Sequence, residues 1–176
     1  LDGARGLGNR MLLPAGPLRE TVGRLEQVDQ VMVNGEGART TDLSVPAPDA
    51  VQFNLVATEA RRLDGSLARA LDKFAGTTVH AVAAIGNPGR FFEMLQSHGI
   101  QVIEHPFRDH ARLSRTDLEF GDGFDVLMTE KDAVKIAAPG SDKYWSVPVE
   151  LSADPAITGP WLERVECRIR SSMEKR

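Results

Sequence analysis

The hydrophobic pattern is most regular in the centre of the chain. Residues 77–85 (TTVHAVAAI) are a nearly continuous run of small and β-branched side chains, typical of a strand covered on both faces of a parallel sheet. Asn87 and Pro88 follow, and they suit the cap and the first position of a helix. That helix has one apolar face and ends at Gly99, and a second strand is expected at 101–104. The sequence therefore predicts a strand–helix–strand unit with a right-handed crossover.

Further elements are predicted on both sides of this unit. Alternation of apolar and polar residues at 51–56 indicates a half-exposed strand, whereas Pro148 places the last strand towards a sheet edge. Helices and strands alternate throughout, so the predicted fold class is α/β, with a mainly parallel sheet flanked by helices. The remaining predicted strands are 30–34, 125–128 and 144–151, and the remaining helices are 17–25, 131–137 and one from Pro155 to the C-terminus.

The C-terminal helix is amphipathic, with apolar residues four positions apart from Trp161 to Met173 and arginines on the other face. Two interpretations of its apolar face are open. It can dock on the sheet, which is the more economical interpretation, or it can contact a membrane surface.

Composition excludes several classes of protein. The chain has 176 residues, which favours about one domain with a sizeable core. A net charge of −4 without a long basic run argues against a dedicated nucleic-acid binder. Cys167 is the single cysteine, so no intramolecular disulfide is possible and a reducing compartment is expected. Apolar runs are far shorter than a spanning helix needs, which predicts a soluble chain.

Residues 1–26 are rich in glycine and proline and are predicted to be mainly loop. The chain begins Leu1-Asp2-Gly3, within a glycine-rich motif and without an initiator Met, which suggests a fragment. The glycine cluster lacks the G-x-x-x-x-G-K-[ST] pattern of a phosphate loop, so a surface loop is the favoured interpretation. Arginine on such a frame suits phosphate recognition, although Arg5, Arg10 and Arg19 can equally be solubilising charges.

Two other segments could carry chemistry. Asp109 and His110 follow a predicted strand, where α/β folds place reactive groups, and an Asp beside a His can make it a general base. A solvated loop histidine is the competing interpretation. Thr129 and Asp132 resemble a capping box, and Lys131 between them could instead help to bind an anion. Among the other histidines, His80 is expected to be a satisfied core residue, whereas His98 and His105 show no partner pattern.

Five strings together resemble one family, the tetraacyldisaccharide 4′-kinases of Gram-negative lipid A biosynthesis. They occur in the family's order and spacing and span nearly the whole chain. They are residues 5–9 with 12–20, residues 33–35, residues 79–88 with 90–92, Phe107 with Asp109 and His110, and residues 127–135.

The resemblance implies a kinase that transfers the γ-phosphoryl group of ATP to the 4′-hydroxyl of a lipid-linked glucosamine disaccharide at the cytoplasmic face of the inner membrane. It implies that this chain is the C-terminal half, a P-loop-kinase-like lobe, and is inactive alone. The missing N-terminal half would hold the phosphate loop, ATP, Mg²⁺ and the membrane contact. Residues 1–28 would then pack on that missing domain, and residues 29–176 would form the C-terminal α/β domain.

The resemblance also implies roles for individual residues. His110 is the expected base-assisting residue, Asp109 its orienter, and Arg19 a substrate or phosphate contact, with Arg5 proposed as a second substrate contact from its place in the glycine-rich frame. The family usually reads Phe-Pro-Asp-His-His, whereas this chain has Arg108 and Ala111 at the second and fifth positions. These departures bear on the geometry of the loop at 107–111 and not on the assignment of His110.

A hypothesis from another class stays open. The chain could be a complete, non-catalytic α/β module that holds an anionic partner through basic side chains. The motivation is the absence of every phosphate-loop element from a chain of foldable length. The residues concerned are Arg5, Arg10, Arg19 and Lys131.

Overall fold

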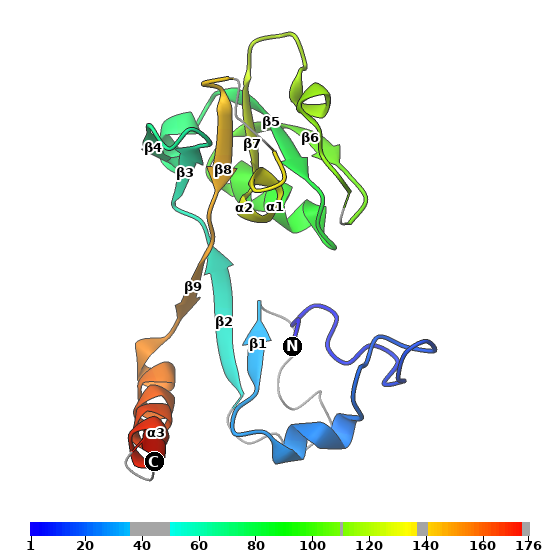
Figure 1. Cartoon of the computed structure of the whole chain (residues 1–176), viewed down its shortest axis with the longest axis vertical. Coiled ribbons are helices and arrows are strands. Elements are labelled where there is room, and N and C mark those ends of the chain that lie inside the picture. The colour runs from blue at the N-terminus through cyan, green and yellow to red at the C-terminus, as the bar shows by residue number, and fades with distance from the viewer. Residues whose placement is uncertain (36–49, 110, 137–140, 174–176) are drawn as a thin grey trace. The chain divides into compact units, whose positions relative to one another are not determined.

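A computed structural model describes residues 1–35, 50–109, 111–136 and 141–173. The chain divides into two compact units (Figure 1). The central unit comprises residues 57–150, and the terminal unit comprises residues 1–56 and 151–176. Because residues 57–150 are one continuous stretch, the central unit is inserted into the sequence of the terminal unit.

The central unit is built on a six-stranded sheet of order β4-β3-β8-β7-β5-β6. Four neighbouring strands, β8, β7, β5 and β6, are parallel, and β3 and β4 extend the sheet with antiparallel pairing. The predicted α/β class is therefore confirmed, with a mixed sheet whose core is parallel. The strands are β3 (Glu59–Arg62), β4 (Ala68–Ala70), β5 (Thr78–Ala83), β6 (Gln101–Pro106), β7 (Asp125–Thr129) and β8 (Tyr144–Val147).

Helix α1 (Pro88–Ser97) joins β5 to the parallel strand β6, which confirms the predicted strand–helix–strand unit. Pro88 is at the first turn, and Gly99 has a φ of 74° after the last turn, a conformation that favours glycine. Asn87 stands at the N-cap position, but its side chain makes no capping hydrogen bond, contrary to the expectation. The cap was predicted from residue type alone, which does not determine where the side chain turns.

Strand β5 is covered on both faces, as its continuous apolar pattern predicted. Val79, Ala81 and Ala83 face a core that includes three buried residues of α1, namely Phe91, Phe92 and Leu95. The alternate residues Val82 and Ala84 belong to a second cluster with Leu113, Leu118, Val126, Met128, Ile136 and Tyr144. Short elements on this side include the 3₁₀ helix η4 (Arg115–Leu118) and helix α2 (Glu130–Ala133). Helix α2 is shorter than the predicted 131–137, of which residue 137 lies outside the described residues.

The predicted last strand, 144–151, is two strands in two different sheets. β8 lies between β3 and β7 inside the larger sheet, so placing this strand at an edge was wrong. Pro148, which cannot donate a ladder hydrogen bond, lies in the break between β8 and β9 (Glu150–Ala153). The proline therefore marks a change of sheet and not a sheet edge.

The terminal unit contains a three-stranded sheet of order β1-β2-β9, with β1 (Met32–Asn34) parallel to β2 (Val51–Val56). Backbone hydrogen bonds join the first residues of the chain to β1, including one of 2.8 Å from Gly3 N–H to Asn34 O. A Cβ on Gly3 would lie 2.7 Å from the carbonyl oxygen of Gly35, so this close approach requires glycine. The predicted helix at 17–25 is the 3₁₀ helix η1 (Val22–Gln27).

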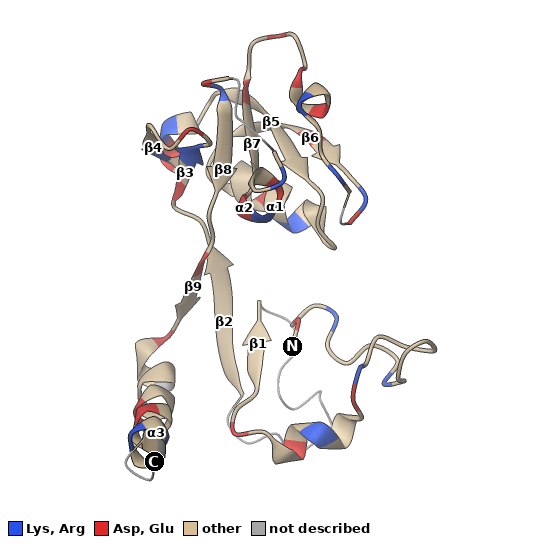
Figure 2. Ribbon diagram, viewed as in Figure 1, with Lys and Arg blue, Asp and Glu red and all other residues tan. Residues whose placement is uncertain are grey.

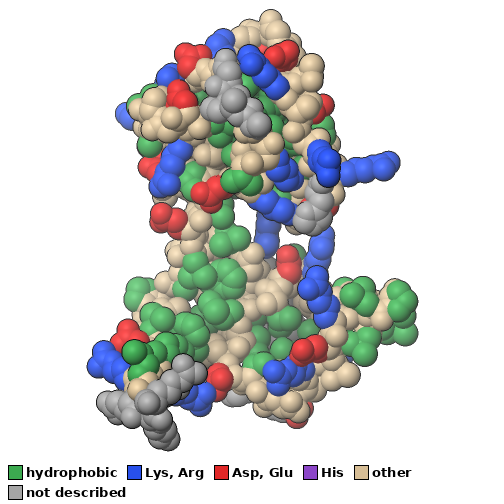
Figure 3. Space-filling model, in the orientation of Figure 1, with side chains coloured by type: hydrophobic (Ala, Val, Ile, Leu, Met, Phe, Trp, Pro, Cys, Tyr) green, Lys and Arg blue, Asp and Glu red, His purple; other side chains and the backbone are tan. Residues whose placement is uncertain are grey.

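Helix α3 (Pro155–Met173) ends the described chain, as the amphipathic pattern predicted. Its apolar face is not buried among the described residues: Ile169 is 54% exposed and Met173 is 73% exposed. The preferred interpretation, docking on the sheet, is therefore not observed for these two side chains. Figure 3 shows hydrophobic side chains exposed over the terminal unit. Other exposed apolar residues of this unit include Leu55, Leu151 and Leu162.

Candidate functional site

Because β5, β6 and β7 are parallel, their carboxyl ends lie together, and this end of the strands is called the carboxyl edge of the larger sheet. Three loops lie there. These loops follow β5, β6 and β7, and in such folds this edge is where ligands bind. A Cβ added to Gly86, after β5, would lie 3.7 Å from the Oδ2 atom of Asp109, after β6. Figure 2 shows basic positions around α1 and α2 and after β6. In the sequence, the basic residues of these segments are Arg90 in α1, Arg108 and Arg112 after β6, Lys131 in α2 and Lys135 after α2.

Asp109, the first predicted site residue, lies at this edge with a half-exposed side chain. Its carboxylate forms an ion pair of 3.5 Å with Lys131 Nζ, which follows β7. The structure therefore brings together two residues that the sequence marked separately. His110 lies outside the described residues, so its orientation by Asp109 stays a prediction.

The segment Thr129–Asp132 contains the predicted cap. Thr129 Oγ1 accepts a hydrogen bond of 3.2 Å from Asp132 N–H, which confirms the capping interpretation. Lys131 Nζ forms an ion pair with the Asp109 carboxylate. Capping is therefore confirmed, and anion binding by Lys131 stays a prediction.

Asp132 is the residue that sequence reasoning missed, because it was considered only as part of the cap. It is fully buried, and its carboxylate accepts hydrogen bonds from Ala84 N–H, Thr129 Oγ1 and Lys135 Nζ. Burial would raise the pKa of Asp132, but these hydrogen bonds outweigh it and hold the pKa below its usual value. The available signal was Lys135, placed three residues after an acidic residue in a short helix.

The glycine-rich loop at 3–10 is folded on itself. The side chain of Asp2 accepts hydrogen bonds from the backbone of Ala4 and Arg5, and Gly6 N–H donates to the carbonyl of Asp2. Gly8 N–H donates to Arg5 O, so these backbone groups are used within the loop. This supports the surface-loop interpretation over a phosphate cradle.

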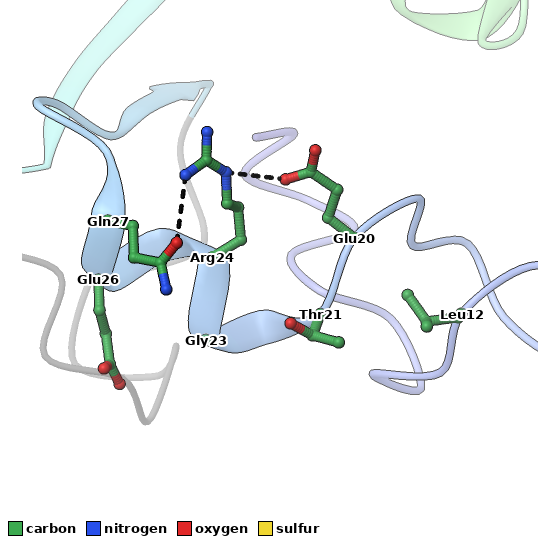
Figure 4. A pocket seen from close by; sticks show the side chains of 7 residues that line it. All are labelled: Leu12, Glu20, Thr21, Gly23, Arg24, Glu26 and Gln27. Atoms are coloured by element: carbon green, nitrogen blue, oxygen red, sulfur yellow. Dashed lines mark hydrogen bonds and ion pairs between the residues drawn. The ribbon is translucent and has the colours of Figure 1, made fainter.

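Arg5 and Arg19, the predicted substrate contacts, belong to the terminal unit, and both are exposed. Neither residue lines the open pocket of about 670 Å³ in the terminal unit, which is shown in Figure 4. Its own arginine, Arg24, donates hydrogen bonds to Glu20 (3.1 Å) and Gln27 (3.3 Å). Because its cation is engaged and Glu20 and Glu26 are acidic, the pocket is poorly suited to a phosphate group.

A second polar cluster lies at the edge strand β6, on the face of β5 that carries His80. As expected, His80 is buried and satisfied: Nδ1 lies 2.8 Å from His105 Nε2, and Nε2 lies 2.9 Å from Asp122 Oδ2. Burial and the charge of His80 lower the pKa of His105. His98 and His105, which show no partner pattern in the sequence, both have partners in the structure: His105 contacts His80, and His98 Nδ1 lies 2.7 Å from Asp72 Oδ1. Both partners are distant in sequence and leave no local pattern.

Within the described ranges no group of three or more His, Cys, Asp or Glu side chains could hold a metal ion. The sequence also has no phosphate-loop pattern. Among the helices described, none combines the length and apolar character needed to cross a bilayer.

Comparison with known proteins identifies relatives of one kind. The chain is 46% identical over 168 residues to a tetraacyldisaccharide 4′-kinase of Alkalilimnicola ehrlichii, covering 96% of this chain and 47% of that protein. It is 48% identical over 160 residues to one of Halorhodospira halophila, covering 90% of this chain and 45% of that protein. The chain thus spans about half the length of the curated relatives it matches.

A solved structure has the same fold. It is that of LpxK from Aquifex aeolicus, described as an "apo" form in complex with ATP, and it aligns with a TM-score of 0.63 at 22% identity. The alignment covers 91% of this chain and 48% of that one. A model of the LpxK family, tetraacyldisaccharide-1-P 4′-kinase, matches residues 1–166. On this evidence the chain belongs to the LpxK family.

Proposed function

We propose that this chain is the C-terminal portion of a 4′-kinase that phosphorylates a tetraacylated glucosamine disaccharide. The observation that carries the proposal is the family match over residues 1–166, with Asp109 of the matching Asp-His pair at the carboxyl edge of the parallel strands. ATP and Mg²⁺ are held mainly by the N-terminal P-loop domain of the full-length enzyme, on which residues 1–28 pack. The enzyme works at the cytoplasmic face of the inner membrane, which the other domain contacts.

In the proposed reaction the 4′-hydroxyl oxygen attacks the γ-phosphorus of ATP, and ADP leaves. His110 assists the transfer of the hydroxyl proton to an Asp of the N-terminal half, and Asp109 orients the imidazole. Lys131, 3.5 Å from Asp109, fixes the carboxylate. Arg19 and Arg5 are the proposed contacts to substrate or phosphate.

The first test is a substitution in the full-length enzyme. His110→Ala is expected to lower kcat by a factor of about 10² or more, because a positioned general base contributes about 10² to 10⁴. Product formation is measured with a lipid disaccharide 1-phosphate and ATP. His98→Ala is the matched control, since His98 is bonded only to Asp72 in the described structure and should leave kcat unchanged. An unchanged kcat in His110→Ala would remove His110 from the mechanism.

The second test uses the isolated chain and separates the kinase from the stand-alone binding module. We expect no measurable turnover and no tight ATP binding, because the described residues offer no phosphate loop and no metal cluster. Calorimetric titration with Mg²⁺–ATP and with inorganic phosphate measures this. Tight phosphate binding that Arg19→Ala abolishes would favour the binding module.

A further inference from the structure

Asp132 is a buried carboxylate to which the proposed reaction assigns no part. Its side chain is 0% exposed. Oδ2 accepts hydrogen bonds from Ala84 N–H at 2.8 Å and Thr129 Oγ1 at 2.7 Å, and Oδ1 accepts one from Lys135 Nζ at 2.7 Å. Burying a charge is costly even when it is paired and hydrogen-bonded, so the burial of this carboxylate needs an explanation.

The partners of Asp132 come from the ends of the two central strands. Ala84 follows β5, and Thr129 is the last residue of β7. The carboxylate therefore ties the loop that leads to Gly86 to the loop that carries Lys131. This connection fixes two of the three loops at the site.

Lys135 extends the network to the third loop. The same Nζ that bonds Asp132 also donates to the carbonyl of Ala111 at 3.4 Å. Ala111 N–H in turn donates to Arg108 O at 2.9 Å, which closes the turn 108–111 after β6. Asp132 therefore reaches this turn through a single lysine.

Lys131 and Lys135 contact the same turn at two points. One helical turn separates them in sequence; Lys131 pairs with the Asp109 carboxylate and Lys135 bonds the Ala111 carbonyl. These two contacts restrain Asp109 and Ala111 at separate points. A group that acts on a reacting hydroxyl needs this restriction, because errors of about 1 Å can cost a factor of about 10² in rate.

We infer that Asp132, acting through Lys135, is a positioning residue that fixes Ala111 and, with it, Asp109 against the ends of β5 and β7. The inference rests on the proposed function for its link to catalysis. The link to the geometry of the turn stands on the hydrogen bonds alone.

The test replaces Lys135 in the full-length enzyme. Lys135→Met keeps the length of the side chain and removes its hydrogen bonds, and we expect kcat to fall about tenfold or more while the KM for ATP is unchanged. Lys135→Arg, which can donate to both oxygens, should restore most of kcat. Hydrogen exchange of the peptide 104–113 should be several-fold faster in Lys135→Met than in the wild type.

Lys143→Met is the matched control, because Lys143 also donates to a backbone carbonyl of the central unit, that of Gly123. It should leave both kcat and the exchange of peptide 104–113 unchanged. Asp132→Asn is the second variant in case Lys135→Met does not fold. It keeps the shape of the side chain and removes the charge, and it should show the same fall in kcat and the same faster exchange.

The outcomes separate the two proposals. Wild-type kcat and wild-type exchange in a folded Lys135→Met or Asp132→Asn variant would overturn the positioning role, even if His110→Ala is inactive. If the wild-type full-length protein shows no kinase activity, the proposed function fails. The exchange measurement would still decide whether Asp132 and Lys135 fix the turn.

Discussion

The central and terminal units differ in how much apolar surface they bury. In the central unit, buried side chains cover both faces of the sheet, including the large side chains of Trp145, Phe74 and Phe92. In the described part of the terminal unit, the buried apolar residues are Leu7, Val31, Val33 and Val51. Burial must offset the entropy of ordering the chain, so the central unit is stabilised mainly by its own core. The terminal unit depends more on backbone pairing.

The largest effect is expected when one large side chain in each unit is replaced by alanine, which tests this contrast. Phe92→Ala should lower the free energy of unfolding by about 3–5 kcal/mol, because it removes a side chain that is 2% exposed. Ile169→Ala in α3 should change it by less than about 0.5 kcal/mol, because Ile169 is 54% exposed. Chemical denaturation measures both. Equal losses from the two variants would show that α3 is buried in solution and would contradict the contrast.

An intermediate effect is expected from backbone conformation. Gly99→Ala should destabilise the central unit by about 1 kcal/mol, because its φ of 74° is unfavourable for alanine. Gly159→Ala in α3 meets no atom within 4 Å of the new Cβ and should be neutral or stabilising by up to about 1 kcal/mol, since alanine favours helix. Thermal melts of the two variants measure the difference. A stabilised Gly99→Ala protein would show that this turn changes conformation.

The smallest expected effect is the pH dependence of the central unit. The pKa of His105 is lowered by burial and by His80, so the unfolded chain binds more protons than the folded one near the unfolded pKa of 6.5. Above pH 6.5, His105 does not lower the free energy of unfolding. As the pH falls below 6.5, the free energy of unfolding decreases. Because His105 is only partly buried, the slope should lie well below the roughly 1.4 kcal/mol per pH unit of one full proton.

His105→Leu is the variant for this measurement, and denaturation at pH 7.5 and pH 5.5 gives the two free energies. The variant should lose part of the pH dependence seen in the wild type. His98→Leu serves as the control, because His98 lies elsewhere and pairs with Asp72. A wild-type pH dependence in His105→Leu would assign the proton to another group.

Local patterns predicted the elements, and they failed where partners are distant in sequence. The apolar run of β5, Pro88 at the start of α1 and Gly99 after its end are properties of adjacent residues, so both elements were predicted. The sheet change at Pro148 depends on which strands flank β8, and no local signal encodes it. The same holds for the His80–His105 contact, whose residues are 25 positions apart.

The candidate site shows the same limit. Asp109 was predicted from its place after a strand, and the structure adds its ion pair with Lys131, 22 residues away. Asp132 was read only as part of the cap with Thr129. Its bond to Ala84, 48 residues earlier, is what makes it a buried connector, and only the folded sheet brings the two together.

The insertion of residues 57–150 within the other unit sets an order of events during synthesis. The ribosome completes every strand of the six-stranded sheet before it makes most of β9 and all of α3. The central unit can therefore fold as its last strand emerges, since domains generally fold as units while the chain grows. Strands β1 and β2, although made before the central unit, must wait until that unit has been made to receive β9 as the third strand of their sheet.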